Sequence, residues 1–319
     1  MPDPQIAISV AVPLYNEVEN TPLLFNAIKT VLEQVGKPFE IIFVDDGSTD
    51  GTRDALRSLA AEDPRLRVIL FRGNYGQSAA MAAGFQASRG DVVIAMDGDL
   101  QNDPADIPLL LEKMAEGYDV VAGWRKNRKD KLIIRKVPSR IANRIICNVT
   151  DVRLHDTGCS LKAFRGEVIR SIRLYGELHR FIPVLARIEG AQITEVVATH
   201  HPRRFGESKY NISRTFRVIM DLTSLNLMIK HLRNPLRFFG TVATWHLMAA
   251  TLVVAWLLYR GLGVGLTLET LNVPVTLVFL LSVGGVQFLL LGLVASLIVK
   301  TGSRRGMNVS PIIYSKDKK

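Results

Sequence analysis

The chain has 319 residues, 48% of them hydrophobic, and a formal net charge of +10. This length is sufficient for one large domain or two smaller ones with a buried core. The charge favours a partner with phosphate groups, and because no nucleic-acid-binding motif is present, an anionic lipid or a phosphorylated substrate is favoured over nucleic acid. Two cysteines without a CxxC pair exclude a disulfide framework, and the apolar run 6–12 is too short for a signal peptide.

Apolar runs and helical patterns alternate from Ile6 to Gly123. The runs predict strands over Ile8–Val12, Glu40–Val44, Arg67–Phe71, Val92–Met96 and Val120–Ala122, and the patterns between them predict helices near 18–35, 51–61, 76–88 and 105–116. This alternation predicts an α/β domain with a mostly parallel sheet and helices on both faces. In such a sheet, ligands bind beyond the carboxyl ends of the strands.

Polar clusters follow three of the predicted strands: 13–17, 45–48 and 97–101. Carboxylates gathered at one edge of a sheet repel each other unless a cation or sugar hydroxyls compensate. Asp97 and Asp99 can bind one Mg²⁺ or Mn²⁺ together with a diphosphate, if the chain turns at Gly98. Each cluster taken alone is also typical of a loop that caps a helix, and Ser48 or Asp50 can cap the helix near residue 51. No GxGxxG or P-loop motif supports a dinucleotide-binding or P-loop fold.

Residues 125–144 contain nine Lys or Arg and one acid, and apolar residues recur at helical spacing beyond residue 131. This pattern predicts an amphipathic helix over 132–148 in the membrane interface, interrupted at Pro138. A helix packed on the domain core with a solvated basic face remains the alternative. A second amphipathic segment, 211–235, is predicted to lie along the interface.

Two apolar blocks without Asp, Glu, Lys or Arg, Phe238–Tyr259 and Val273–Val299, occupy the last quarter of the chain. Each is long enough to cross a hydrocarbon core of about 30 Å as a helix, although buried core helices are the alternative. Pro274 is expected in the first turn of the second helix, and 260–272 is expected to be the connecting loop. His246 and Gln287 within the blocks are expected to form hydrogen bonds between the helices.

Basic residues flank the two blocks on the same side. Lys230, Arg233 and Arg237 precede the first block, and six Lys or Arg follow the second between residues 300 and 319. The positive-inside rule therefore predicts a two-span membrane protein with both termini and the first domain in the cytosol.

Six motifs in this order resemble the inverting family-2 glycosyltransferases with a GT-A fold. They are VPLYNE (12–17), VDDGSTDGT (44–52), NYGQSAAMAAGF (74–85), DGDLQNDP (97–104), DTGCSLKAF (156–164) and RRFGESKY (203–210). The chain is most similar to the polyprenyl-phosphate branch, which includes dolichol-phosphate mannose synthase, bactoprenol glucosyltransferases and undecaprenyl-phosphate aminoarabinose transferase. The resemblance covers nearly the whole chain. It implies a GT-A domain over 1–210, a juxtamembrane helix over 211–235, two transmembrane helices within 236–300 and a basic cytosolic tail over 301–319.

The resemblance also implies roles for the residues that match its motifs. The base and ribose of a nucleotide-sugar would be lined by Pro13, Tyr15, Glu17 and Asp46. The metal ion on the donor diphosphate would be held by Asp97, Asp99 and Gln101, and the donor phosphate would be contacted by Arg203, with Lys209 ordering the loop. The acceptor phosphate would be bound by Arg125, Arg135 and Ser139.

The implied reaction is an inverting displacement by a polyprenyl phosphate, assisted by Mg²⁺ or Mn²⁺, at the cytosolic face of a bacterial plasma membrane. A phosphate monoester with a second pKa of about 6 hardly needs a general base. Asp156 matches a position proposed as a catalytic base, and both this role and an orienting role remain open. UDP-glucose is the first expected donor, ahead of aminoarabinose, mannose and N-acetylglucosamine donors.

Two alternatives are less well supported by the sequence. A processive polysaccharide synthase would carry a QxxRW motif, which is absent. A non-catalytic membrane scaffold would be expected to lose its metal-binding acids first, yet Asp97, Asp99 and Gln101 are present. Homo-oligomerisation is implied by analogy, although residues 300–306 depart from the acidic and aromatic tail of many bacterial relatives.

Overall fold

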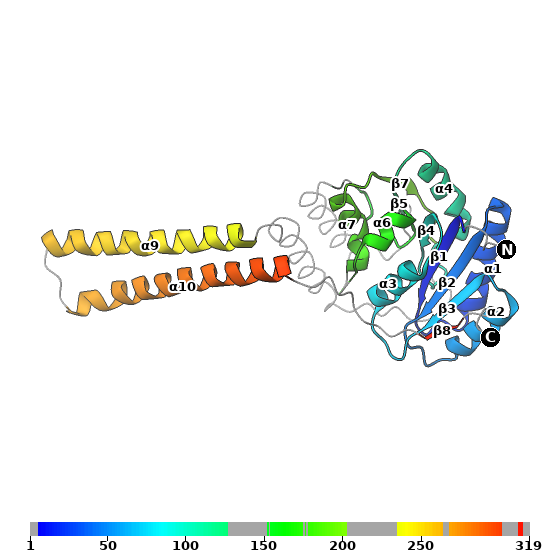
Figure 1. The fold of residues 1–319 in the computed structure, drawn as a ribbon, viewed down its shortest axis with the longest axis horizontal. Helices are drawn as coiled ribbons and strands as arrows, with labels where there is room; N and C mark the ends of the chain where they lie inside the picture. Colours follow the sequence, from blue (N-terminus) through cyan, green and yellow to red (C-terminus); the bar gives the residue numbers. More distant parts are fainter. Residues whose placement is uncertain are drawn as a thin grey trace. The chain divides into compact units, whose positions relative to one another are not determined.

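The computed structural model describes residues 6–126, 152, 154–174, 176, 178–202, 235–263, 268–301 and 312–314. The chain divides into two compact units, formed by residues 1–222 with 306–319 and by residues 223–305. The first unit contains a sheet with helices on both faces, and the second contains two long helices (Figure 1). The predicted interfacial helix, 132–148, lies outside the described residues, as does the predicted juxtamembrane helix up to residue 234.

One sheet with the strand order β7-β5-β6-β4-β1-β2-β3-β8 forms the centre of the first unit. Its strands span Ile8–Leu14 (β1), Phe39–Asp45 (β2), Leu66–Leu70 (β3), Val92–Ala95 (β4), Val120–Trp124 (β5), Lys162–Arg165 (β6), Ile193–Val197 (β7) and Ile312–Tyr314 (β8). β6 runs antiparallel to β4 and β5, and β8 runs antiparallel to β3, whereas the other pairs are parallel. The carboxyl ends of β1 to β5 therefore share one edge. Lys162, the first residue of β6, pairs with Ala95 and Ala122 at that same edge.

Helices cover both faces of this sheet (Figure 1). They span Asn20–Val35 (α1), Thr52–Glu62 (α2), Gln77–Ala87 (α3), Ile107–Ala115 (α4), Gly166–Ser171 (α6) and Ile182–Ile188 (α7), with short 3₁₀ turns at Pro104–Asp106 (η1) and Leu178–Phe181 (η2). Alternate residues of β2 point to opposite faces. Ile41 and Phe43 pack with α1, α2 and α4, whereas Ile42 and Val44 pack with α3.

The predicted fold class is confirmed, since every strand and helix expected between residues 8 and 122 is present within a few residues of its expected bounds. The described elements β6, α6, α7 and β7 carry no sequence prediction. β6 shows why: its four residues, Lys162–Arg165, include a buried lysine and form neither an apolar run nor an alternating pattern. β8 lies in the segment expected to be a cytosolic tail.

The second unit consists of α9 (Pro235–Gly263) and α10 (Leu268–Thr301). Over Pro235–Leu262 and Leu271–Ile298, both helices are long and apolar enough to cross a membrane. They pack closely at glycines of α10: a Cβ added at Gly285 would lie 2.9 Å from Leu247 Cγ, and one added at Gly292 would lie 2.9 Å from Phe239 Cβ. Small residues of this kind let two helix backbones approach each other.

Two sequence expectations about this unit are wrong. Pro274 does not lie in a first turn, because α10 begins at Leu268 and the proline is inside the helix. The helix tolerates it there because only one hydrogen bond near its beginning is lost. The connecting loop is also shorter than 260–272, since α9 continues to Gly263.

The expected hydrogen bond from His246 to the other helix is not the contact that the structure shows. His246 Nδ1 lies 2.9 Å from the Val242 carbonyl of its own helix, and its ring centroid lies 5.1 Å from that of Phe288 in α10. The hydrogen bond is therefore made within α9, while the ring provides the contact between helices. The role of Gln287 stays a prediction.

Candidate active site

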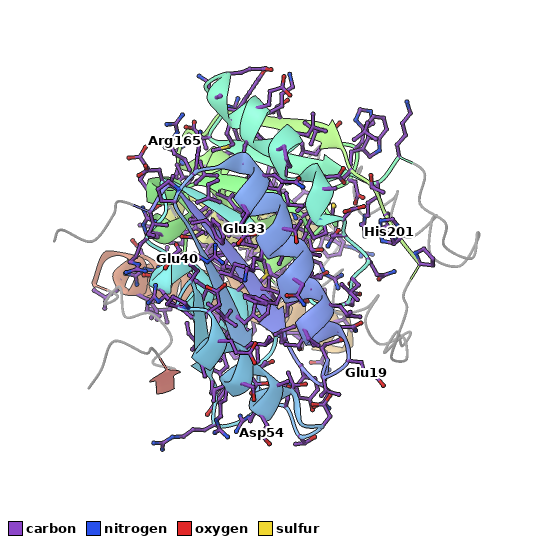
Figure 2. The ribbon with its side chains drawn as sticks, turned by 90° about the vertical axis from the view of Figure 1, so that its right-hand side faces the viewer. Glu19, Glu33, Glu40, Asp54, Arg165 and His201 are labelled. Atoms are coloured by element: carbon purple, nitrogen blue, oxygen red, sulfur yellow. The ribbon has the colours of Figure 1, made fainter. Side chains whose placement is uncertain are left out.

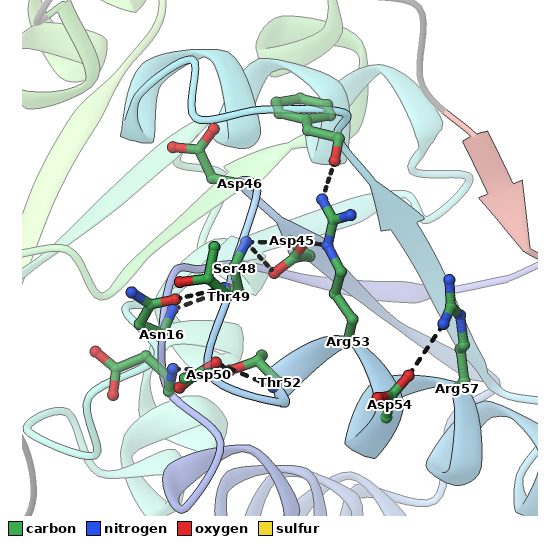
Figure 3. Close-up of polar contacts among 12 residues, drawn as sticks. Asn16, Asp45, Asp46, Ser48, Thr49, Asp50, Thr52, Arg53, Asp54 and Arg57 are labelled. Atoms are coloured by element: carbon green, nitrogen blue, oxygen red, sulfur yellow. Dashed lines mark hydrogen bonds and ion pairs between the residues drawn. The ribbon is translucent and has the colours of Figure 1, made fainter.

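The loops after β1 and β2 are joined by hydrogen bonds between the backbone of one loop and the side chains of the other (Figure 3). The N–H of Asn16 donates to Ser48 Oγ over 2.8 Å, and Asn16 Oδ1 accepts from the Thr49 N–H over 2.9 Å. The N–H of Glu17 donates to Thr52 Oγ1 over 2.9 Å. Asn16 has a φ of 55°, which asparagine tolerates better than most residues. These bonds fix the two loops predicted to line the base and ribose relative to each other.

The adjacent acids after β2 have different partners. Asp45 is fully buried and pairs with Arg53 Nε at 2.8 Å, so it closes its own loop (Figure 3). Asp46 instead accepts the N–H groups of Tyr75 and Gly76 over 2.7 and 2.8 Å, and so holds the loop before α3. Burial raises the pKa of Asp46, although these two N–H groups oppose the shift.

Only one of the two expected capping residues contacts the first turn of α2. Asp50 Oδ1 accepts the N–H of Thr52 over 3.0 Å, whereas Gly51 occupies the N-cap position itself. Ser48 serves the loop after β1 through its bond to Asn16. The DDGS segment is therefore more than a helix cap, because most of its polar groups contact neighbouring loops.

The chain bends at Gly98, which is the condition set above for Asp97 and Asp99 to bind one cation. A Cβ added at this glycine would lie 2.3 Å from Leu14 Cδ2 and 3.2 Å from the Pro13 carbonyl oxygen. A larger residue there would require the buried Leu14 side chain to shift. This close packing places Asp97 and Asp99 directly beside the end of β1.

The residues after Asp99 adopt a strained backbone and are held by hydrogen bonds to the distant segment around His201. Leu100 has a φ of 58°, a conformation that costs a bulky residue about 1–3 kcal/mol. The N–H of Gln101 donates to Asp99 Oδ1 over 3.2 Å, and its carbonyl accepts from the His201 N–H over 2.8 Å. His201 is in turn fixed by its Nε2 contact with Asp103 Oδ2 at 2.8 Å.

The antiparallel direction of β6 brings the DTGCS loop to the same edge of the sheet. Arg125 Nε and Nη2, at the end of β5, contact Asp156 Oδ2 and Oδ1 over 2.7 and 3.0 Å. Lys162 is buried, and its Nζ donates to the carbonyl of Cys159. The carboxylates of Asp97, Asp99 and Asp156 therefore lie at the same edge as the basic side chains of Arg125 and Lys162.

These groups influence one another electrostatically. Burial, followed by the charge of Asp99, raises the pKa of Asp97. Burial lowers the pKa of Lys162, although Asp156 and Asp97 stabilise its charged form. Burial also disfavours a charged Arg125, but the hydrogen bonds and charge of Asp156 outweigh it and raise the pKa of Arg125. An additional cation beside Asp97 and Asp99 would relieve their mutual repulsion.

The chemistry of the residues at this edge fits a divalent cation. Asp97, Asp99 and Gln101 supply hard oxygen atoms, which Mg²⁺ and Mn²⁺ prefer. Among the described residues, no group of three or more His, Cys, Asp or Glu side chains is arranged to hold a metal ion. A site with two carboxylates therefore requires further oxygen ligands, which a diphosphate provides.

The structure brings together the described members of the predicted site. These are Pro13, Tyr15, Glu17, Asp46, Asp97, Asp99, Gln101, Arg125 and Asp156. Arg135, Ser139, Arg203 and Lys209 lie outside the described residues, so their roles stay predictions. Gln77, Ser160 and Lys162 are not identified as functional residues from the sequence alone. Each lies within one of the six motifs, and this is the sequence feature that could have identified them. Two histidines of the neighbouring loops contact acids: the His155 N–H donates to Glu195, and His201 Nε2 contacts Asp103.

A model of the family described as glycosyl transferase family 2 matches residues 9–173, which is more than half of the chain. The matched region contains the loops after β1, β2 and β4 and the DTGCS loop. The chain belongs to glycosyl transferase family 2.

Two relatives match this family 2 glycosyltransferase along most of their own length. The dodecaprenyl-phosphate galacturonate synthase of Rhizobium johnstonii is 40% identical over 304 residues, which cover 94% of the chain and 90% of the relative. The undecaprenyl-phosphate 4-deoxy-4-formamido-L-arabinose transferase of Pseudomonas paraeruginosa is 37% identical over 293 residues, which cover 92% and 85%.

A solved structure confirms the GT-A fold. The glucosyl-3-phosphoglycerate synthase of Mycobacterium tuberculosis, in complex with Mn²⁺, UDP and phosphoglyceric acid, superposes with a TM-score of 0.53. The superposition has 18% sequence identity and covers 70% of this chain and 78% of that one. At this identity, the likeness shows a common fold.

Proposed function

We propose that this family 2 glycosyltransferase transfers a sugar from a UDP-sugar to a polyprenyl phosphate, with inversion at the anomeric carbon. The observation that carries the proposal is the meeting of the Asp97–Asp99 pair with the Arg125–Asp156 pair at one edge of the sheet. The first pair suits a diphosphate with its cation, and the arginine of the second suits another anion. The names of the two relatives support a polyprenyl phosphate acceptor.

On the donor side, the joined loops after β1 and β2 hold the nucleoside. Pro13, Tyr15, Glu17 and Asp46 line the base and ribose, in keeping with their place beside the carboxylate pair. Arg203 and Lys209 remain predicted contacts of the donor phosphates. When bound, Mg²⁺ or Mn²⁺ at Asp97, Asp99 and Gln101 supplies positive charge that stabilises the departing diphosphate.

The reaction requires little proton transfer. The acceptor phosphate, with a second pKa of about 6, is largely a dianion at neutral pH. One of its oxygens forms a bond to the anomeric carbon while the bond from that carbon to UDP breaks, and the bonding electron pair leaves with the β-phosphate of UDP. Because no proton must be removed, Asp156 acts as an orienting residue that holds Arg125 toward the acceptor.

On the acceptor side, Arg125, with Arg135 and Ser139, binds the lipid phosphate, and α9 and α10 anchor the enzyme in the bilayer. The pairing of β8 with β3 supports an even number of spans, because it returns the C-terminal segment to the sheet of the first unit. Both termini and the catalytic unit then lie on one membrane face. Together with the basic flanks, this supports the cytosolic face of a bacterial plasma membrane. Assembly into a homo-oligomer stays a prediction.

Two sugars are the leading candidates for the group that is transferred. The sequence alone ranks UDP-glucose first. The relative named for galacturonate transfer, which is 40% identical over 94% of this chain, favours UDP-galacturonate as the second candidate. A pocket that hydrogen-bonds a particular sugar substituent rejects analogues that lack it, so the two donors can be separated by their rates.

A donor screen tests this function. The full chain in detergent is incubated with Mn²⁺, undecaprenyl phosphate and one sugar donor at a time. The donors are UDP-glucose, UDP-galacturonate, UDP-4-deoxy-4-formamido-L-arabinose and GDP-mannose. Lipid products are identified by mass spectrometry. We expect a single lipid-linked monosaccharide from one UDP-sugar. Chains of many sugars would support a processive synthase, and no product from any donor would support a non-catalytic scaffold.

The metal assignment is tested with the Asp99→Asn variant. Loss of one carboxylate from a two-carboxylate site is expected to abolish transfer while membrane insertion is unchanged. Asp54→Asn is the matched control, because Asp54 is exposed and pairs with Arg57 on the surface of α2. Unchanged turnover of Asp99→Asn would refute the metal site.

A further inference from the structure

Asp97 is held by side chains from two separate segments of the chain. Gln77, the first residue of α3, donates from Nε2 to Asp97 Oδ1 over 2.7 Å. Ser160, in the loop before β6, forms a second side-chain hydrogen bond with Asp97. Ser160 Oγ is itself oriented, because it accepts from Asn102 Nδ2 over 2.7 Å. Because Asn102 is the donor in that bond, the Ser160 O–H remains available to donate to the Asp97 carboxylate.

Gln77 is fixed by contacts on both sides of it in the sequence. The preceding Tyr75 and Gly76 donate their N–H groups to Asp46. The following Ser78 is buried and lies 2.8 Å, through its Oγ, from His179 Nδ1 in η2. The segment 75–78 therefore links two loops: it contacts the loop after β2 through Asp46, and the loop after β4 through the bond from Gln77 to Asp97.

A carboxylate that binds a cation must keep one orientation, and free rotation about its last bond would weaken binding. Neutral donors that bond to the carboxylate restrict this rotation without competing for it as a cation would. Lys162 and Arg125 influence Asp97 only through their charges, whereas Gln77 and Ser160 are bonded to it. The two neutral donors therefore set its geometry.

We propose that Gln77 is a positioning residue of the donor site, which fixes the Asp97 carboxylate for the divalent cation with the help of Ser160. The inference rests on the proposed function, because it assumes that Asp97 binds the cation of a nucleotide-sugar. Gln77 acts through Asp97 and contacts neither the sugar nor the acceptor.

The test measures Mn²⁺ binding directly. Full-length enzyme in detergent is titrated with Mn²⁺ in the presence of UDP, and free Mn²⁺ is quantified by electron paramagnetic resonance. The variant Gln77→Met keeps the length of the side chain and removes the donor. Gln86→Met is the matched control, because Gln86 lies on the same helix, is exposed and donates only to the Arg170 carbonyl among the described contacts. Ser160→Ala removes the second donor.

We expect Gln77→Met and Ser160→Ala each to weaken Mn²⁺ binding about tenfold, the scale found when a group that orients a metal ligand is removed. Their combination should differ from the product of the two effects, because both release the same carboxylate. At saturating Mn²⁺, the turnover of Gln77→Met should recover to within about threefold of wild type, whereas general damage to the fold would lower it at every Mn²⁺ concentration.

Binding by Gln77→Met within about twofold of wild type, at an unchanged melting temperature, would overturn the inference. If Gln77→Met melts early, Ser160→Ala decides: weaker Mn²⁺ binding supports the inference, and unchanged binding overturns it. Wild-type enzyme that binds no Mn²⁺ with UDP would instead refute the proposed function. The two failures are thus distinguishable.

Discussion

Arg125 and Asp156, 31 residues apart in the sequence, contact each other through two side-chain hydrogen bonds of 2.7 and 3.0 Å at the edge of the sheet. The pair was predicted in two separate roles, with Arg125 on the acceptor phosphate and Asp156 as either a base or an orienting group. A carboxylate with both oxygens on a guanidinium is poorly placed to accept another proton. The contact therefore favours the orienting role.

The Asp156→Asn variant tests this role. Loss of the carboxylate charge frees the Arg125 guanidinium, so we expect turnover to fall about tenfold, with the acidic limb of the pH–rate profile unchanged. Steady-state kinetics from pH 5 to 9 check this. Asp119→Asn is the control, because Asp119 pairs with Arg165 at 2.9 Å at the other edge of the sheet. A loss of about 1,000-fold or more with a displaced acidic limb would assign Asp156 as a base.

Gly47 is expected to be irreplaceable in the donor site. Its φ is +81°, and an added Cβ would lie 2.4 Å from the carbonyl carbon of Gly73. Gly47→Ala should displace the loop before α3 and raise the KM for the UDP-sugar about tenfold or more. Gly36→Ala is the control that separates backbone strain from steric collision. Gly36 also has a positive φ, +69°, but nothing lies within 4 Å of its added Cβ. That control should cost about 1 kcal/mol of stability and leave KM unchanged. Equal KM values in both variants would contradict the collision.

Glu40 lies at the edge of the sheet opposite the candidate active site. Glu40 and Arg165 are on one side of the first unit, and His201 is on the other (Figure 2). The buried Glu40 carboxylate pairs with Arg67 at 2.9 Å and Arg89 at 3.0 Å. Burial alone would raise the pKa of Glu40, but hydrogen bonds from Ser9, Arg89 and Arg67 outweigh it and lower the pKa. Its contribution to stability is therefore present above the unfolded pKa of about 4.3 and is lost as the pH falls through the lower folded value.

We therefore expect Glu40→Gln to lose about 2 kcal/mol of stability at pH 7. The difference from wild type should shrink below pH 4, because the wild-type carboxylate then becomes protonated too. Thermal melts in detergent between pH 3.5 and 7 measure both effects. Glu33→Gln is the control, since Glu33 makes an exposed pair with Arg65. A constant difference across this pH range would show that the carboxylate charge is not the cause.

The packing of α9 against α10 predicts a different sensitivity for two glycines. Gly285→Leu should separate the helices, because a Cβ there would meet Leu247 at 2.9 Å and the Ala243 carbonyl at 3.3 Å. Gly240→Leu should be tolerated, since nothing lies within 4 Å of its added Cβ. Cysteine pairs placed across the two helices would report the change as a lower crosslinking yield. Similar yields in both variants would contradict this packing.

The central sheet could be predicted from sequence because its signals are local. Apolar strands such as Ile8–Leu14 and Phe39–Asp45 are buried along their length, and their parallel direction brings the residues after them to one edge. The DDGS and DGDLQ clusters were placed together on this argument alone. The two long apolar helices were predicted for the same kind of reason, since length and composition suffice.

The sequence by itself thus determined the fold class, the apolar helices and the grouping of the acids, because each follows from the period and composition of a continuous segment. Only the tertiary structure decided that Asp156 pairs with Arg125, that Gln77 bonds to Asp97 and that Asp46 holds the loop before α3. These contacts depend on the direction of β6 and on the packing of α3, which are set by pairing between distant segments. A local pattern of apolar residues does not predict which distant residue a polar side chain will contact.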